Sequence, residues 1–272
     1  MNPTPVSRSR RHTLFFLDAV RRFAPVHLDT EVDMTAVRGH RRAARARGGP
    51  RYSTAAYVLH AAGRVLARHP EANAALGGRL WPRIARFPHV NGKLTLDKTL
   101  DGQRVVLSTV VPGLQRATLQ EIQRHLEQFR DGDPDTMPEF ERLRRLHRAP
   151  LLIGSTAFRL AAGRLRGRDR LMGTVAVTSL GHRPVDGFHS VGGTTTTLGL
   201  GRTVDRPVVR DGRVTVAPVM RLSLTFDHRV IDGAEAADVL GELKEHLEEF
   251  RTDAADEPPT TPPAAAVPEE VS

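Results

Sequence analysis

The stretch MRLSLTFDHRVIDGAEAADVL, residues 220–240, changes its pattern at its centre. Residues 220–226 alternate between apolar and polar side chains, which is typical of a half-buried β-strand. From Ala234 to Phe250 the apolar residues recur at helical spacing, which predicts a helix with one face packed on a core. The strand and the helix are joined by HRVIDG, residues 228–233.

Three residues in this junction are candidates for a functional site. If the strand continues in phase, His228 lies at the edge of the buried face, where burial keeps an imidazole neutral and able to accept a proton. The alternative is a hydrogen-bonded core histidine. Asp232 precedes the helix, so it is an N-cap worth roughly 1 kcal/mol, or an acid that fixes the turn by pairing with an arginine, or both. Gly233 is expected to let the backbone turn sharply into the helix.

The composition limits the function. The 272 residues include 40 Lys and Arg against 31 Asp and Glu, a net charge of +9, and no cysteine. Disulfides, thiolate nucleophiles and cysteine-ligated metals are therefore excluded, which suits a reducing cytoplasm. The charge indicates a solvated surface, or a site for an anionic small ligand or an acidic protein. Nucleic-acid binding is not expected, because the sequence has no zinc-finger spacing, no basic heptad array and few aromatic residues.

A membrane location is not expected either. No apolar run approaches the roughly 20 residues that cross a bilayer. SRRHTLFFL, residues 9–17, is similar to a twin-arginine export signal. However, Asp18 ends its apolar part well short of the about 7–15 residues that a signal needs. The sequence therefore predicts a cytoplasmic protein.

The remaining segments predict one mixed α/β domain at 10–250. It lies between a flexible N-terminus, 1–9, and a tail, 251–272, with too little apolar content to fold. Helices are predicted at 10–23, 35–47, 53–69, 117–130 and 137–148, strands at 26–34, within 78–112, at 172–180 and at 194–202, and a hairpin turn at Asp211-Gly212.

Four motifs carry a resemblance to a known family. DHRVIDG, after an alternating strand and before an apolar helix, resembles the active-site motif of dihydrolipoamide acyltransferases, the core subunits of 2-oxo acid dehydrogenase complexes. EVDMT (31–35), HPEANAAL (69–76) and GTVAVTSLG (173–181) resemble three other motifs of that family. The likeness extends from about Arg10 to Phe250 and is much weaker over 78–150. It implies the fold of chloramphenicol acetyltransferase, a mixed sheet flanked by helices.

The resemblance also implies roles for single residues. His228 would be the general base that takes a proton from the thiol of coenzyme A, or of dihydrolipoamide in reverse, so that the sulfur attacks a thioester. Thr178 matches the family's Ser or Thr, which donates a hydrogen bond to the oxyanion. Asp232 matches a structural aspartate, and Arg11 would be its partner. The family is trimeric, with the histidine of one subunit facing the hydroxyl of its neighbour, so an obligate homotrimer is expected.

A second His-Arg-x-x-Asp-Gly string, HRPVDG, occurs at 182–187. In the family, the strand that carries the hydroxyl donor is followed by Gly-x-x-Gly-Val-Asp-x-Phe. Residues 181–188, GHRPVDGF, align with that segment position by position. The string is therefore predicted to be a structural turn, and His228 alone is predicted to be catalytic.

The chain also departs from the family. No lipoyl or peripheral-subunit-binding domain precedes the match, so no covalently bound lipoyl group is expected on this chain. The resemblance implies coenzyme A as a substrate, and no metal is expected. Asp97-Lys98 is similar to a lipoylated turn but lacks the surrounding β domain. Ser179 and the stretch GGTTTTLG (192–199) replace an Asn and an Asn-Pro-Pro stretch, so the acyl pocket or the acceptor channel is expected to differ. The tail lacks the family's apolar anchor, which predicts isolated trimers.

Three functions remain open at this stage. The first is a stand-alone acyltransferase that uses acyl-CoA or an acyl group on a separate lipoyl or carrier protein. The second is a non-catalytic trimeric scaffold, and the third is acylation of a small-molecule hydroxyl or amine. A scaffold has no need for an intact DHRVIDG motif, which favours an enzyme.

Overall fold

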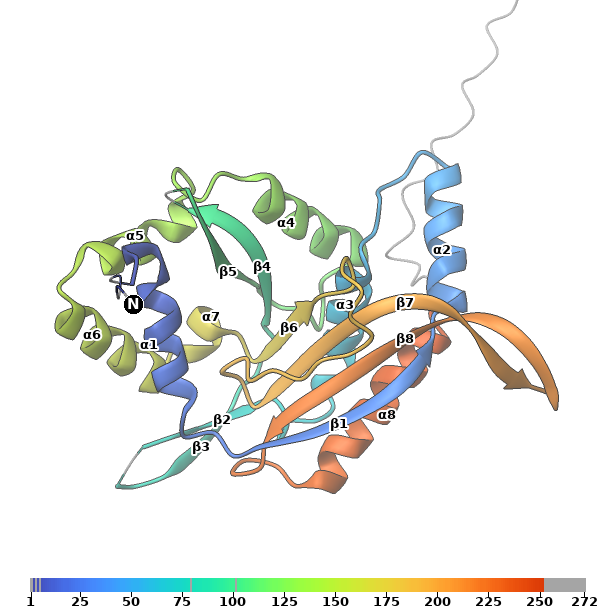
Figure 1. Ribbon diagram of the computed structural model, residues 1–272. Coiled ribbons are helices and arrows are strands. Elements are labelled where there is room, and N and C mark those ends of the chain that lie inside the picture. The colour runs from blue at the N-terminus through green and yellow to red at the C-terminus, as the bar shows by residue number, and fades with distance from the viewer. Residues whose placement is uncertain (1, 3, 5, 79, 101, 252–272) are drawn as a thin grey trace, which may run out of the picture.

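The computed structural model describes residues 2, 4, 6–78, 80–100 and 102–251 (Figure 1). Its helices are α1 (Arg11–Val20), α2 (Thr35–Ala46), α3 (Thr54–Leu66), α4 (Leu119–Asp131), α5 (Glu141–Arg148), α6 (Leu151–Gly163), α7 (Arg168–Met172) and α8 (Gly233–Glu248), with 3-10 turns η1 (Arg8–Arg10) and η2 (Pro138–Phe140). Its strands are β1 (Pro25–Asp33), β2 (Ala74–Gly77), β3 (Arg83–Arg86), β4 (Gly92–Leu100), β5 (Gln103–Val111), β6 (Val175–Ser179), β7 (Thr196–Arg210) and β8 (Arg213–Asp227).

Six of these strands form one mixed sheet in the order β1-β8-β7-β6-β4-β5. The pairs β4–β6 and β6–β7 are parallel, and the other neighbours are antiparallel. β7 and β8 form a long hairpin that curves away from the rest of the sheet (Figure 1). Its turn has positive φ at both Asp211 (50°) and Gly212 (74°), as a two-residue hairpin turn with Asp-Gly requires.

The main core lies between the sheet and the helices α3 and α8. Leu222, Leu224 and Phe226 point into it from β8 and are at most 1% exposed. The alternate residues of β8, Ser223 and Thr225 among them, point to the opposite face. The loop between β6 and β7 crosses that face, where Ser223 donates a hydrogen bond to the carbonyl of Phe188. One face of the sheet is thus apolar and the other is polar.

Most of the sequence-based expectations for the fold are confirmed. The mixed α/β architecture and the hairpin turn are present, and Ser53 caps α3 by accepting a hydrogen bond from the N–H of Ala56. The sequence missed α6 and α7. The apolar residues of α6 follow no one-sided pattern in the sequence. In the structure, Leu152 and Ile153 near its start are 82% and 62% exposed, so these apolar residues do not mark a buried face.

The two chain ends were expected to lack structure. Arg8 and Ser9, assigned to the flexible N-terminus, instead join Arg10 in the turn η1, and Ser9 is buried there. The expected disordered tail, 251–272, lies outside the described residues apart from Arg251. Within the described ranges, no helix is both long and apolar enough to cross a membrane.

Candidate functional site

His228 lies in the turn between β8 and α8. Its backbone N–H donates to the carbonyl of Ala24 over 2.9 Å, and its ring centroid is 5.4 Å from that of Phe226. The imidazole is 46% exposed. The predicted burial is therefore wrong for the single chain, because β8 ends at Asp227 and the turn carries the next side chain out of the core. In the single chain the imidazole is available to a ligand or to another subunit.

Asp232 stands at the N-cap position of α8, as predicted, but its side chain makes no capping hydrogen bond. Its Oδ1 lies 3.5 Å from Nδ1 of His228, and the carboxylate is 88% exposed. The expected pairing of Asp232 with Arg11 is wrong for the single chain, because Arg11 donates instead to the carbonyls of His147 and Ala149. Asp232 thus faces the histidine itself.

Gly233 begins α8 without the backbone strain that the sequence suggested. Its φ lies outside the left-handed region, and a Cβ at this position would meet no atom within 4 Å. The sharp turn is made by residues 228–230. A glycine is therefore not required at 233 by the single chain.

Asp227 anchors the turn, a role that was not predicted from the sequence. Its carboxylate is 2% exposed and binds the guanidinium of Arg229 with both oxygens, Oδ1 to Nε at 2.8 Å and Oδ2 to NH2 at 2.6 Å. Oδ1 also accepts the N–H of Ala24 at 3.3 Å, and Arg229 lies over the ring of Phe23, 5.1 Å from its centroid. Asp227 therefore ties both sides of His228 to the segment before β1. Asp227 continues the polar positions of β8, Ser223 and Thr225, and its burial was therefore not predicted from the sequence.

Thr178 lies near the end of β6, on the polar face of the sheet. Its Oγ1 is 2.7 Å from Oγ1 of Thr95, the residue opposite it on β4. Thr95 lies in the segment where the resemblance is weak, and the sequence analysis did not single it out. Only the register of β4 against β6 brings the two hydroxyls together.

Within one chain, Thr178 and His228 lie far apart. Thr178 pairs with Gly199 on β7, and Gly199 pairs with Ser223 on β8. Asp227, the last residue of β8, follows Ser223 by four residues, which is about 14 Å along the strand, and β8 lies two strands from β6, which adds about 10 Å at right angles. The backbone of Thr178 is thus about 17 Å from the end of β8 that leads into His228, and a site that uses both residues needs a second subunit.

The turn HRPVDG, 182–187, has a structural role, as predicted. Asp186 binds Arg202 of β7 with 2.6 Å between Oδ1 and Nε. The carbonyl of Asp186 also approaches β7 so closely that a Cβ on Gly201 would lie 1.9 Å from its oxygen. This close packing requires a glycine at 201 and fixes the loop on the polar face.

His69, in the His-Pro motif after α3, fixes the start of α8. Its Nδ1 lies 2.9 Å from Glu235 and its Nε2 lies 3.1 Å from Glu242. Burial lowers the pKa of His69, but the hydrogen bonds and charges of the two glutamates outweigh it, and the net pKa is raised above 6.5. Both glutamates lie on α8, so His69 joins the segment after α3 to the helix that follows the His228 turn.

A pH dependence of stability follows from this pKa. A group whose pKa is raised on folding contributes stability that is fully present below its unfolded pKa of 6.5 and lost as the pH rises through the folded value. We expect the difference in free energy of unfolding between the wild type and His69→Gln to shrink as the pH rises from 6.5 through the folded pKa of His69. Urea unfolding of both proteins across this range measures it. Parallel curves would contradict the assignment of a charged His69.

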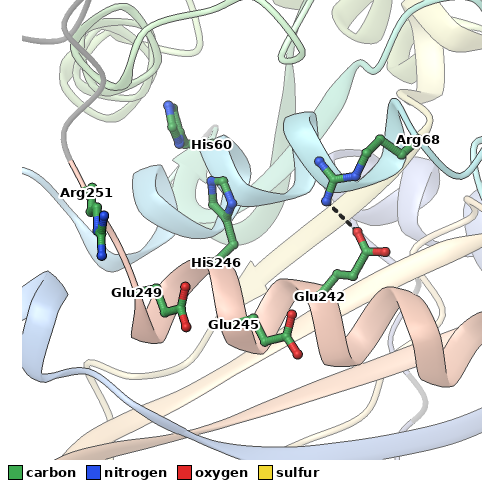
Figure 2. A pocket seen from close by; sticks show the side chains of 7 residues that line it. All are labelled: His60, Arg68, Glu242, Glu245, His246, Glu249 and Arg251. Atoms are coloured by element: carbon green, nitrogen blue, oxygen red, sulfur yellow. Dashed lines mark hydrogen bonds and ion pairs between the residues drawn. The ribbon is translucent and has the colours of Figure 1, made fainter.

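A cavity of about 540 Å³ lies between α3 and α8. Figure 2 shows its lining, in which His246 points toward His60 and acidic side chains of α8 follow one another along the rim. Burial, with the charges of Arg64 and His246, lowers the pKa of His60 to about 3, so His60 is neutral. None of the predicted site residues lines this cavity. Among the described residues, no group of three or more His, Asp or Glu side chains is arranged to hold a metal ion.

The comparisons with known proteins agree with the predicted fold. A probable dihydrolipoamide acetyltransferase from Listeria monocytogenes superposes with a TM-score of 0.69 and 18% identity, over 93% of this chain and 97% of that one. Residues 153–253 match the family described as 2-oxoacid dehydrogenases acyltransferase (catalytic domain). The chain has the fold of this catalytic domain. The resemblance inferred from the motifs is thus confirmed for the fold, and for the family over residues 153–253.

Two further relatives of this acyltransferase family are informative. Dihydrolipoamide acetyltransferase from Azotobacter vinelandii superposes with a TM-score of 0.69 and 21% identity, over 92% of this chain and 93% of that one. The acetyltransferase component of the Bacillus subtilis pyruvate dehydrogenase complex is 52% identical over 50 residues. Those residues are 18% of this chain and 11% of that protein, so the sequence match covers a small part of the relative.

Proposed function

We propose that the protein is an acyltransferase that moves an acyl group between a thioester and an acceptor, at a site formed by two subunits of a homotrimer. The observation that carries the proposal is the separation of His228 and Thr178 within one chain that has the acyltransferase fold. A base and an oxyanion donor this far apart can meet only across a subunit boundary. The homotrimer is the assembly that the resemblance implies.

The crystallographic study of the Azotobacter vinelandii enzyme supports the choice of residues. That study addressed a serine, a histidine and an asparagine in the catalytic mechanism, with the histidine and the asparagine four positions apart. His228 and Asp232 have the same spacing. The serine of that enzyme precedes its histidine by 52 positions, and Thr178 precedes His228 by 50.

The proposed mechanism starts from a neutral His228. With Nδ1 turned toward Asp232, 3.5 Å away, an Nδ1–H tautomer leaves Nε2 free as the base. Nε2 takes the proton of a thiol, coenzyme A in one direction, and the thiolate attacks the thioester carbonyl. The hydroxyl of Thr178 from the neighbouring subunit donates to the resulting oxyanion. When the intermediate collapses, the leaving thiolate takes the proton back from His228. A thiol carried on a separate lipoyl protein is the proposed acyl partner.

Mixing two inactive variants tests the shared site. His228→Ala and Thr178→Val are each expected to lose transfer between acetyl-CoA and dihydrolipoamide. If the variants are unfolded together and reassembled at equal amounts, about a quarter of the sites receive an intact histidine from one chain and an intact threonine from the other. We therefore expect about a quarter of the wild-type activity to return.

The control for this experiment is each variant unfolded and reassembled alone, which must stay inactive. Light scattering must give a trimer in every sample. A monomeric protein, or a mixed trimer with no recovered activity, would overturn the shared site. Full activity in the His228→Ala variant alone would show that His228 is not the base, whereas a wild-type trimer with no transfer activity would point to a non-catalytic scaffold.

A further inference from the structure

We infer that Thr95 is a positioning residue for the hydroxyl of Thr178, and that it sets the direction in which that hydroxyl donates. This inference rests on the proposed function, because it gives the oxyanion donor a second side chain that the reaction requires. Thr95 and Thr178 lie opposite each other in the parallel pair β4–β6, and their Oγ1 atoms are 2.7 Å apart. Both side chains are half-buried.

The two hydroxyls of the pair have only two hydrogens between them. Each hydroxyl has one hydrogen to donate and two lone pairs to accept with. In the described part of the chain, neither hydroxyl has another side-chain partner. If Thr178 donates to Thr95, its only hydrogen is used and it cannot stabilise an oxyanion. If Thr95 donates to Thr178, the hydrogen of Thr178 is free to point away from β4.

The reacting state selects the second arrangement. An oxyanion accepts most strongly from a donor that is itself accepting a hydrogen bond, because the chain of hydroxyls polarises in one direction. Thr95 therefore donates to Thr178, and Thr178 donates to the oxyanion. The backbone register holds both hydroxyls in place before substrate arrives, so little reorganisation is needed during the reaction.

The position of Thr95 suits this role. The strand residues on either side of Thr178, Val177 and Ser179, lie in the β6 ladder, which pairs with β4 on one side and β7 on the other. On the β7 side the residue opposite Thr178 is Gly199, which has no side chain to offer. On the β4 side it is Thr95. The hydroxyl of Thr178 thus has one neighbour across the ladder that can orient it.

A double-mutant cycle tests the inference, with acetyl-CoA and dihydrolipoamide as substrates. Thr95→Val removes the donor and keeps the shape, and we expect kcat to fall about tenfold with KM unchanged, because the lost interaction acts in the transition state. Thr95→Ser restores the hydroxyl and is expected to restore kcat. In the Thr178→Val background, Thr95→Val is expected to have no further effect.

Ser108→Ala is the matched control. Ser108 pairs with Thr95 from the other side, on β5, but makes no hydrogen bond with it among the described residues. Its loss is expected to leave kcat unchanged. The melting temperature of every variant shows whether the fold is kept, and Thr95→Ser keeps the test valid if Thr95→Val unfolds.

The possible failures are distinguishable. If His228→Ala and Thr178→Val lose activity while Thr95→Val keeps it, the positioning role is wrong and the proposed function stands. If Thr95→Val loses more activity than Thr178→Val, the roles of the two threonines are reversed and the inference is wrong. If His228→Ala and Thr178→Val both keep full activity, the proposed shared site fails, and if the wild type transfers no acyl group, the proposed function fails.

Discussion

Replacing His228 with alanine is expected to lower kcat for acyl transfer by about 10²–10⁴-fold, the usual contribution of a general base. The free energy of unfolding is expected to change by less than about 0.5 kcal/mol, because the imidazole is 46% exposed and packs on one side only. The measurement is transfer of the acetyl group from acetyl-CoA to dihydrolipoamide, followed by release of coenzyme A. The loss of rate without loss of stability distinguishes a base from a core histidine.

The chain supplies its own control for this variant. His182 stands in the second His-Arg-x-x-Asp-Gly string and is exposed in a loop whose contacts are structural. We expect His182→Ala to keep full activity. Equal losses in both variants would show that the effect comes from the removal of an exposed imidazole in general. An active His228→Ala would remove the mechanistic assignment and leave only the fold.

The sequence predicts the elements on which this site is built because their patterns are local. Residues 220–226 alternate and residues 234–250 have helical spacing, and the structure places them in β8 and mostly in α8. The two patterns meet in the turn that carries His228. The Asp-Gly pair likewise predicts its own hairpin turn, since few residues accept positive φ at two successive positions. Each of these signals lies within a few neighbouring residues.

The contacts of the site could not be predicted in this way, because they join distant parts of the chain. Thr95 meets Thr178 across 83 positions of sequence, through a strand register that no local pattern encodes. Ala24 meets Asp227 across 203 positions. The alternation along β8 also led to the wrong expectation that His228 is buried. Alternation predicts which face a strand residue occupies but not where the strand ends. Local rules thus give the strand and the helix, and tertiary packing decides which side chains meet.

Asp227 is the residue whose loss we expect to cost the most stability near the site. Its carboxylate is 2% exposed and pairs with Arg229, which is 31% exposed. The carboxylate accepts hydrogen bonds from the guanidinium of Arg229 and from the N–H of Ala24, and losing a hydrogen bond to a charged group costs about 1.5–3 kcal/mol. Arg229 would keep access to water, so Asp227→Ala is expected to lower the free energy of unfolding by about 2–3 kcal/mol. Chemical denaturation measures it, and Asp186→Ala is the matched control, since its pair with Arg202 is exposed to solvent and is expected to contribute little to stability.

Asp227 also links stability to catalysis, because it accepts the N–H of Ala24, and the carbonyl of Ala24 accepts the N–H of His228. Asp227→Asn keeps an oxygen for Ala24 and loses the charge that holds Arg229. We expect this variant to keep more activity than Asp227→Ala at a temperature where both are folded. If Asp227→Ala stays folded and transfers acyl groups at the wild-type rate, the turn does not need this anchor, and the position of His228 is set by contacts with the neighbouring subunit.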